Sequence, residues 1–402
     1  MVVKPGYKES EVGVIPEEWN VSTVGDEFDI KLGKMLDSEK NVGVPKPYLG
    51  NRAVQWGRID LSDLPTVPMT PTDIEKFRLR NGDLLVCEGG EVGRAALWNS
   101  PIEECYYQKA LHRLRPIRGF DSRLMGALLR QWSDSGVLAN YVTQTSIAHL
   151  PREKFMGVPM PVPPVAEQRA IATVLSDVDS LLGALERLIA KKRDLKLAAM
   201  QQLLTGQTRL PGFHSEWEVK RLGEICDIAM GRTPARLNKK FWGRGYKWLS
   251  IADLQGKVVS ESKEEITELA ASTMEVIPKG TLLMSFKLSI GRLCFAGCDL
   301  YTNEAICSFK NLQASGEFLY YALGRTDFSL YGKQAVKGYT LNKESLKIVE
   351  VDLPSLPEQN AIAAVLSDMD AELDTLEQRL AKTRALKQGM MQELLTGRTR
   401  LV

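Results

Sequence analysis

The sequence has little of what metal sites, disulfide frameworks and membrane spans require. It holds three histidines in 402 residues, and its six cysteines form no CxxC pair. No apolar run reaches the length of about 18 residues that a membrane span needs, and the start MVVKPGYKESEVG lacks the pattern of a secretory signal. We therefore expect a cytoplasmic chain without a membrane segment or disulfides. The lone CxxxC of Cys294 and Cys298 predicts buried thiols rather than zinc ligands.

Motifs of catalysis are also missing. The chain has no GxxxxGK[ST] phosphate loop, no Asn/Asp-Pro-Pro-Tyr/Phe tetrapeptide of amino-methyltransferases, no GxSxG and no HExxH. Two Glu-x-Lys fragments, 218–220 and 261–263, lack the preceding Pro-Asp of nuclease sites. We therefore predict no catalytic residues, no metal and no cofactor in this chain.

The composition is that of an ordinary soluble protein. Hydrophobic residues make up 44% and charged residues 25%, so two or three domains with sizeable cores are expected. The net charge of +2 does not indicate a nucleic-acid binder, which often has a strongly basic domain. Any affinity for DNA must come from local patches or be shared with a more basic partner.

A long internal repeat is the main signal in the sequence. Residues 163–210 align with residues 354–401 without a gap, and 28 of the 48 positions are identical. Glu167, for example, recurs as Glu358 at an offset of 191. A period this long excludes a solenoid, whose repeats run about 20–50 residues, and indicates a duplicated half-protein.

The segments before each repeat resemble each other more weakly. Trp19 and Gly33 recur as Trp217 and Gly231, and Gly93-Arg94 recurs as Gly291-Arg292. Between these anchors the sequences differ, as two recognition surfaces on one scaffold would. We predict domains at 1–163 and 207–353, and helical regions at 164–206 and 354–402.

Each helical region predicts one helix of about 39 residues, roughly 58 Å long. Prolines stand at its start, Glu-Gln suits the positive end of the helix dipole, and Gly206 or Gly397 suits the C-terminal cap. Apolar residues at spacings of three and four predict a coiled-coil seam. The first seam is Ile171, Val174, Val178, Leu181, Leu185, Leu188, Leu195, Ala199 and Leu203, interrupted by Lys192; the second is Ile362, Leu366, Met369, Leu373, Leu376, Leu380, Leu386, Met390 and Leu394. We expect the two helices to pair antiparallel, the alternative being two independent coiled-coil arms.

The globular domains are predicted to be mixed α/β folds, with buried strands at 83–87 and 281–286. Glycine-rich loops follow both strands, and their basic residues are candidates for contact with phosphate or guanine: Arg94, Lys287 and Arg292. A hairpin turn with a solvated arginine is an equal alternative for either loop alone.

The second domain contains a loop, 238–248, in which basic and aromatic residues alternate. We predict DNA contact for Lys239, Lys240 and Arg244, and a core position for Trp248. Polar loops late in each domain are candidate base-reading elements, and we single out Gln144, Thr145 and Ser146 in the first and Lys337 and Tyr339 in the second.

The order of these elements resembles one known family. Ile15-Pro16 with Trp19, a variable domain, Glu167-Gln168, a long helix, LLTGQTRLPGF, a second variable domain and a second such helix resemble the specificity subunit of Type I restriction-modification systems. The likeness covers nearly the whole chain and includes Gly231-Arg232-Thr233-Pro234, so Arg232 and Thr233 join the candidate DNA contacts. The first domain lacks this Gly-x-Thr-Pro motif, which predicts a different early loop.

The resemblance implies an α/β (α+β) protein with two pseudo-two-fold related target recognition domains, separated by two long antiparallel helices. It implies a non-catalytic subunit in which each domain binds one half of a bipartite target in double-stranded DNA. The helices would set the spacer and dock two methyltransferase subunits, through which motor-nuclease subunits join. S-adenosylmethionine, ATP and magnesium would belong to these partners. Four residues added to the helices would then lengthen the spacer by about 6 Å, or roughly two base pairs.

Other functions remain open on the sequence alone. A coiled-coil scaffold that never binds DNA and an adaptor in another phage-defence complex are compatible with the same repeat. A self-sufficient nuclease or methyltransferase would need a site that none of the known motifs indicates.

Overall fold

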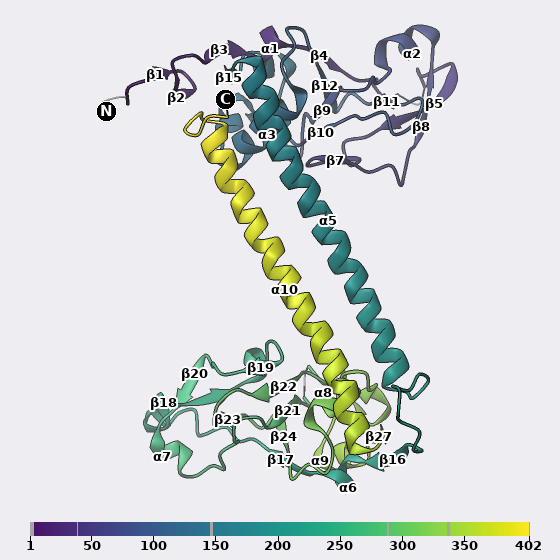
Figure 1. The fold of residues 1–402 in the computed structure, drawn as a ribbon, viewed down its shortest axis with the longest axis vertical. Coiled ribbons are helices and arrows are strands. Elements are labelled where there is room, and N and C mark those ends of the chain that lie inside the picture. The colour runs from purple at the N-terminus through teal and green to yellow at the C-terminus, as the bar shows by residue number, and fades with distance from the viewer. Residues whose placement is uncertain (1–3, 38, 145–147, 288, 336–337, 402) are drawn as a thin grey trace. The chain divides into compact units, whose positions relative to one another are not determined.

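The computed structural model describes residues 4–37, 39–144, 148–287, 289–335 and 338–401. The chain divides into two compact units, Met1–Arg187 with Gln378–Val402, and Leu188–Glu377 (Figure 1). Each unit combines one globular domain with the half of each long helix that lies beside it. Among the described residues, every helix is too short or too polar to span a bilayer.

The globular domain of unit 1 is built around an antiparallel sheet of four strands in the order β10-β9-β12-β4. A second sheet, β11-β5-β8, and four two-stranded pairs surround it, β1-β2, β3-β15, β6-β7 and β13-β14. The strands are β1 Tyr7–Ser10, β2 Gly13–Pro16, β3 Asn20–Thr23, β4 Phe28–Leu32, β5 Val44–Leu49, β6 Val54–Gln55, β7 Arg58–Ile59, β8 Thr66–Met69, β9 Leu84–Cys87, β10 Ala95–Leu97, β11 Tyr106–Tyr107, β12 Leu111–Pro116, β13 Thr143–Gln144, β14 Ala148–His149 and β15 Pro159–Val162. The helices are α1 Val24–Glu27, α2 Pro71–Phe77, α3 Ser122–Ser135, η1 Val137–Tyr141 and α4 Arg152–Met156.

Unit 2 repeats this plan. Its main sheet has the order β17-β24-β21-β22-β19, its second sheet is β20-β18-β23, and β16-β27 and β25-β26 form pairs. The strands are β16 Glu218–Arg221, β17 Asp227–Met230, β18 Trp242–Leu249, β19 Val258–Val259, β20 Glu264–Ile266, β21 Leu282–Ser285, β22 Leu293–Ala296, β23 Tyr301–Thr302, β24 Ile306–Lys310, β25 Lys333–Ala335, β26 Gly338–Thr340 and β27 Glu350–Leu353. The helices are α6 Leu222–Ile225, η2 Lys239–Phe241, η3 Ile251–Asp253, α7 Glu268–Ala271, α8 Gly316–Gly324, η4 Phe328–Leu330 and α9 Lys343–Lys347. The predicted α/β class and the buried strands β9 and β21 are confirmed.

The two long helices are α5, Val165–Leu203, and α10, Leu356–Leu394, each 39 residues long. In unit 1, Glu186 pairs with Arg384 at 2.6 Å and Asp179 with Lys387 at 2.5 Å. In unit 2 the repeat-equivalent bonds join Arg193 to Glu377 and Lys196 to Asp370. Residue numbers rise along one helix as they fall along the other, so the predicted antiparallel pairing is confirmed within each unit.

The predicted seam of α5 is wrong at three leucines. Leu181, Leu188 and Leu195 are 40%, 39% and 46% exposed, whereas Leu185 and Ile189 are buried. The buried and half-buried positions instead follow the order 171, 175, 178, 182, 185, 189, 192, 196, 199 and 203. Lys192 and Lys196 can occupy this seam because acidic side chains of α10 pair with both ammonium groups. On α10, Leu386 is 60% exposed and Lys387 takes the seam position that Leu386 was predicted to fill.

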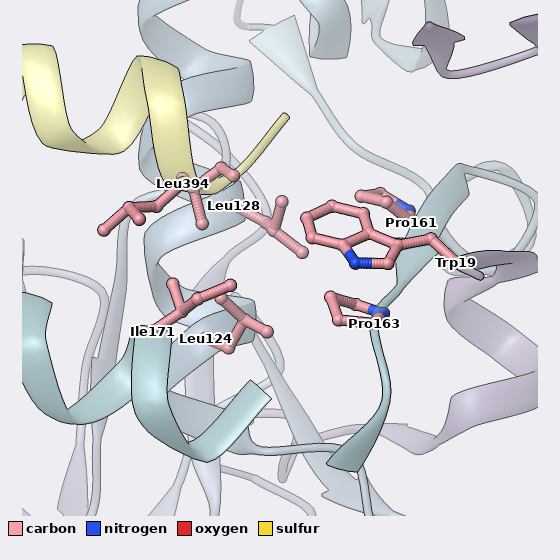
Figure 2. A pocket seen from close by; sticks show the side chains of 8 residues that line it. Trp19, Leu124, Leu128, Pro161, Pro163, Ile171 and Leu394 are labelled. Atoms are coloured by element: carbon pink, nitrogen blue, oxygen red, sulfur yellow. The ribbon is translucent and has the colours of Figure 1, made fainter. Parts of the chain in front are cut away.

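The start of α5 is fixed in unit 1 by a buried carboxylate. Glu167 is fully buried and accepts hydrogen bonds from the Trp19 indole at 2.9 Å and from Arg400 Nε at 2.7 Å. Arg400 lies just after α10, where Gly397 has the left-handed φ of +68° expected of a C-terminal cap. Leu394 of α10, Ile171 of α5 and Trp19 line one apolar pocket (Figure 2). The C-terminal segment of one repeat therefore completes the domain that precedes the other.

Unit 2 contains the equivalent bond. Glu358, at the start of α10, is fully buried and accepts from Arg209 Nε and Nη2, both at 2.6 Å. The neighbouring Gln359 accepts from the backbone N–H of Ser315 at 2.8 Å, as Gln168 does from Asp121 at 3.1 Å. The sequence suggested only that the Glu-Gln pair suits the positive end of the helix dipole. In the structure this pair also joins each long helix to its domain. We call each Glu–Arg bond, Glu167–Arg400 and Glu358–Arg209, the carboxylate clamp.

Replacing Arg400 by alanine should destabilise unit 1 by about 3 kcal/mol, because it leaves Glu167 buried without its cation. Burial raises the pKa of Glu167, but the hydrogen bonds from Arg400 and Trp19 outweigh this and hold the pKa below its ordinary value. The clamp therefore contributes fully above about pH 4.3 and is lost as the pH falls through the lowered pKa. Urea unfolding at pH 7 measures the loss.

Arg398→Ala is the matched control for this prediction. Arg398 pairs with Glu393 at the surface, where a salt bridge contributes roughly 0–1 kcal/mol. The double variant Glu167→Gln with Arg400→Ala should recover part of the stability, since no unpaired charge stays buried. Equal stability of the Arg400 and Arg398 variants would contradict the clamp.

Candidate nucleic-acid interface

Three loops meet at one end of the main sheet in each unit. In unit 1 they are the loop that begins at Gly33 after β4, the glycine-rich loop 88–94 and the turn 107–110. In unit 2 they are the loop that begins at Gly231 after β17, the loop 286–292 and the turn 302–305. We call each set of three loops a loop junction.

The same backbone hydrogen bonds build both junctions. Lys34 N–H donates to the carbonyl of Tyr107 at 2.8 Å, and Arg232 N–H donates to that of Thr302 at the same distance. Three further pairs match: Gln108 to Leu49 and Asn303 to Leu249, Glu88 to Ala110 and Phe286 to Ala305, and Gly33 to Leu111 and Gly231 to Ile306. The scaffold of the junction is thus duplicated although most of its side chains differ.

Glycine is required where the first loop meets the turn. A Cβ atom on Gly33 would lie 2.2 Å from the carbonyl oxygen of Tyr107, and one on Gly231 would lie 2.2 Å from that of Asn303. Any larger residue would push the loop away from the turn. The early loops therefore begin alike in both units. The predicted difference between them begins at the next residue, where Lys34 pairs with Asp73 in unit 1 and Arg232 is exposed in unit 2.

In unit 1 the side chain of Arg94 holds its own loop together. Its guanidinium donates to the carbonyl of Asn51 at 2.9 Å and pairs with Glu91 at 3.3 Å, leaving the side chain 14% exposed. These contacts give Arg94 a positioning role, and its contact with DNA stays a prediction. The hairpin β13-β14 adjoins this loop, because Leu150 N–H donates to Glu88. Gln144 lies on β13, and Thr145 and Ser146 lie outside the described residues.

In unit 2, Thr233, a predicted DNA contact, is hydrogen-bonded to a carboxylate that was not among the predicted residues. Its hydroxyl donates to Glu304, which is exposed in the turn 302–305. This bond, the Glu304 backbone N–H, and the charges of Lys287 and Arg236 hold the pKa of Glu304 below its usual range. Thr233, Lys287 and Glu304 are therefore brought together, and Glu304 is ionised at neutral pH.

Arg236, also missed, connects the early loop to strand β18. Its guanidinium lies 4.0 Å from the centre of the Trp242 ring and 4.8 Å from that of Trp248, and it pairs with Glu264 at 2.6 Å. Trp248 is 1% exposed, so its predicted core position is confirmed. The guanidinium–indole contacts keep the base of the basic loop ordered.

The remaining predicted residues of unit 2 occupy two places. Lys239 and Lys240 on η2 and Arg244 on β18, the central strand of the second sheet, are exposed. Lys287 and the exposed Arg292 lie on the loop that follows β21. Tyr339 lies on β26, and Lys337 is outside the described residues.

A sequence signal for the missed turn residues existed but was weak. The segments YYQKAL, 106–111, and YTNEAI, 301–306, share Tyr and Ala at an offset of 195. Two identities in six positions do not stand out without the matching backbone. The described residues contain no cluster of three His, Cys, Asp or Glu side chains suited to a metal ion.

Comparisons with known proteins agree on one family. A family model for the Type I restriction modification DNA specificity domain matches residues 16–192 and 214–383. A putative type I restriction enzyme MjaX specificity subunit of Methanocaldococcus jannaschii is 24% identical over 418 residues, covering 98% of this chain and 97% of that protein.

Solved structures show the same fold. The S subunit of a Type I restriction-modification system from M. genitalium matches with a TM-score of 0.60 at 17% identity, over 94% of this chain and 96% of that one. A chain from a study of complex assembly and conformational transition in the type I R-M system also matches with a TM-score of 0.60, at 20% identity over 95% and 99% of the two chains. With both of its repeats matched, the protein belongs to the family of Type I restriction-modification DNA specificity proteins.

Proposed function

We propose that this chain is the DNA specificity subunit of a Type I restriction-modification complex, in which each globular domain binds one half of a bipartite target. The observation that carries the proposal is the loop junction, whose backbone is duplicated while its side chains differ. Two readers of two different half-targets need a common scaffold and unlike surfaces. Exposed cations around the second junction suit contact with DNA phosphates: Arg232, Lys239, Lys240, Arg244 and Arg292.

The chemistry of methylation and cleavage belongs, in this proposal, to partner subunits. Two methyltransferase subunits bind the chain, and motor-nuclease subunits join through them. S-adenosylmethionine, ATP and magnesium are then bound by the partners, and this chain supplies position on the DNA and no catalytic group. Its place of action is the cytoplasm, where the host DNA is.

The repeat supports a stoichiometry of two. Leu195 of unit 2 and Leu386 of unit 1 are equivalent under the repeat, and they are 46% and 60% exposed. A large apolar side chain kept exposed at the same position of both helices suits a protein partner better than it suits water. We assign these leucines to two equivalent docking sites for methyltransferase subunits.

The long helices act in this proposal as the element that fixes the distance between half-targets. Each is continuous over 39 residues, and its seam pairs with the other helix inside each unit. Seven residues added to each helix keep the seam in register. An insertion of four residues, the length first suggested by the sequence, would rotate the seam of one helix away from the seam of the other. A heptad adds about 10 Å, or roughly three base pairs.

The proposal predicts a bipartite methylation motif. The chain is co-expressed with its methyltransferase subunit, and modified adenines in host DNA are mapped by sequencing. Exchange of residues 211–353 for those of another family member should change one half of the motif only, and exchange of the first domain should change the other half. Absence of any new methylation from a soluble, assembled complex would instead favour a scaffold or a defence adaptor.

Docking is tested by charge substitution at the duplicated leucines. Leu195→Asp or Leu386→Asp should each leave one bound methyltransferase subunit, and the double variant none, because a buried unpaired carboxylate opposes association. Native mass spectrometry counts the subunits. Leu197→Asp is the control, since Leu197 is 67% exposed on the same helix but its repeat equivalent is Gln388. Two subunits still bound to the double variant would disprove the assignment.

Spacing is tested by adding one heptad to both helices, after Arg187 in α5 and after Gln378 in α10. The motif should keep both half-targets and gain roughly three base pairs of spacer. Replacing seven residues of each helix without adding length is the control and should leave the spacer unchanged. An unaltered spacer in the lengthened, assembled complex would rule out the helices as its determinant.

A further inference from the structure

The two loop junctions carry opposite charges at one equivalent position. The turn 107–110 of unit 1 has Lys109 where the turn 302–305 of unit 2 has Glu304. Both side chains are exposed, and the residues on either side are Gln108 and Ala110 in one turn and Asn303 and Ala305 in the other. The charge at this exposed position is therefore reversed although the turn around it is matched.

The backbone around this position is held from both sides. In unit 2, Asn303 N–H donates to Leu249 at 2.9 Å and the carbonyl of Ala305 accepts from Phe286 at 3.0 Å. The corresponding bonds of Gln108 and Ala110 in unit 1 are both 3.0 Å long. Lys109 and Glu304 therefore project from an anchored backbone, which is what a side chain needs in order to discriminate between bases.

The carboxylate of Glu304 is suited to contact with a DNA base and not to contact with a DNA phosphate. It is a carboxylate among cations, held by the Thr233 hydroxyl and near Lys287 and Arg236. A carboxylate repels phosphate oxygens, so it cannot serve the DNA backbone. The groups it can accept from in the major groove are the exocyclic amino groups of cytosine and adenine. Lys109, an ammonium donor, suits the acceptors of guanine instead.

We propose that Lys109 and Glu304 are specificity-determining residues, each of which binds one base of its half-target: Glu304 an amino-bearing base, and Lys109 a guanine. The inference rests on the proposed function and adds to it the position in each domain that discriminates. The Lys109 side chain is exposed, so its ammonium group is accessible to a ligand.

The test is the methylation motif of Glu304→Gln. Glutamine has nearly the same shape but both donates and accepts, so one position of the second half-target should relax from an amino-bearing base toward any base. Preference at that position should fall roughly ten- to hundredfold, the scale of one lost base contact. Lys109→Met should relax one position of the first half-target in the same way. Glu218→Gln and Lys154→Met, exposed substitutions in the same units away from the junctions, are the controls and should leave the motif unchanged.

The outcomes separate this inference from the proposed function. Absence of a bipartite motif with the unmodified chain would count against the proposed function itself. A bipartite motif that Glu304→Gln and Lys109→Met leave unaltered would overturn the inference alone. So would loss of all methylation in a variant that still unfolds at the normal temperature and binds its methyltransferase subunits, because a residue that reads one base does not control the whole interface.

Discussion

The rest of the structure depends on the salt bridge that a buried carboxylate forms at the start of each long helix. Glu167 and Glu358 are both fully buried, and each is neutralised by an arginine from the tail of the other helix. A carboxylate without such a partner would make the helix start unstable. Neither repeat can therefore complete its own domain, and each unit takes half of its helical structure from the other half of the chain. This exchange explains why the repeats stay alike over 48 residues while the domains diverge.

The loop junctions show the same separation between fixed backbone and free side chain. Gly33 and Gly231 are held by close approach to a carbonyl oxygen, and Ala110 and Ala305 by a hydrogen bond to the neighbouring loop. The position just before each alanine is exposed and carries Lys109 in one unit and Glu304 in the other. The two units therefore offer different chemistry to a ligand on the same backbone. Under the proposed function, this arrangement allows the half-targets to change while the partner-binding surfaces stay the same.

Sequence reasoning predicted the long-range plan better than the local geometry. The gapless repeat and the prolines and glycines at its ends gave two helices of the observed length, because these signals are local and repeated. The seam was misplaced at Leu181, Leu188 and Leu195 because α5 carries leucines on two adjacent faces, and hydrophobicity cannot tell that Lys192 and Lys196 occupy the seam with acidic partners from 174 or more residues away. Arg94 was singled out correctly as part of a loop, but its bond to Asn51 depends on a contact 43 residues away. Glu304 was missed because its neighbours, Thr233, Arg236 and Lys287, come from two loops that are distant in sequence.

The low net charge has a consequence for how such a chain finds its target. The net charge is +2 over 402 residues, whereas strong, sequence-independent binding depends on an excess of basic residues that neutralise phosphates. Glu304 within its second junction weakens phosphate attraction further. In the proposed complex, a few anchored side chains provide the selectivity, and the docked methyltransferase subunits provide much of the affinity. The ratio of specific to non-specific affinity is then high, because the affinity for DNA of any sequence is small compared with the affinity for the correct target.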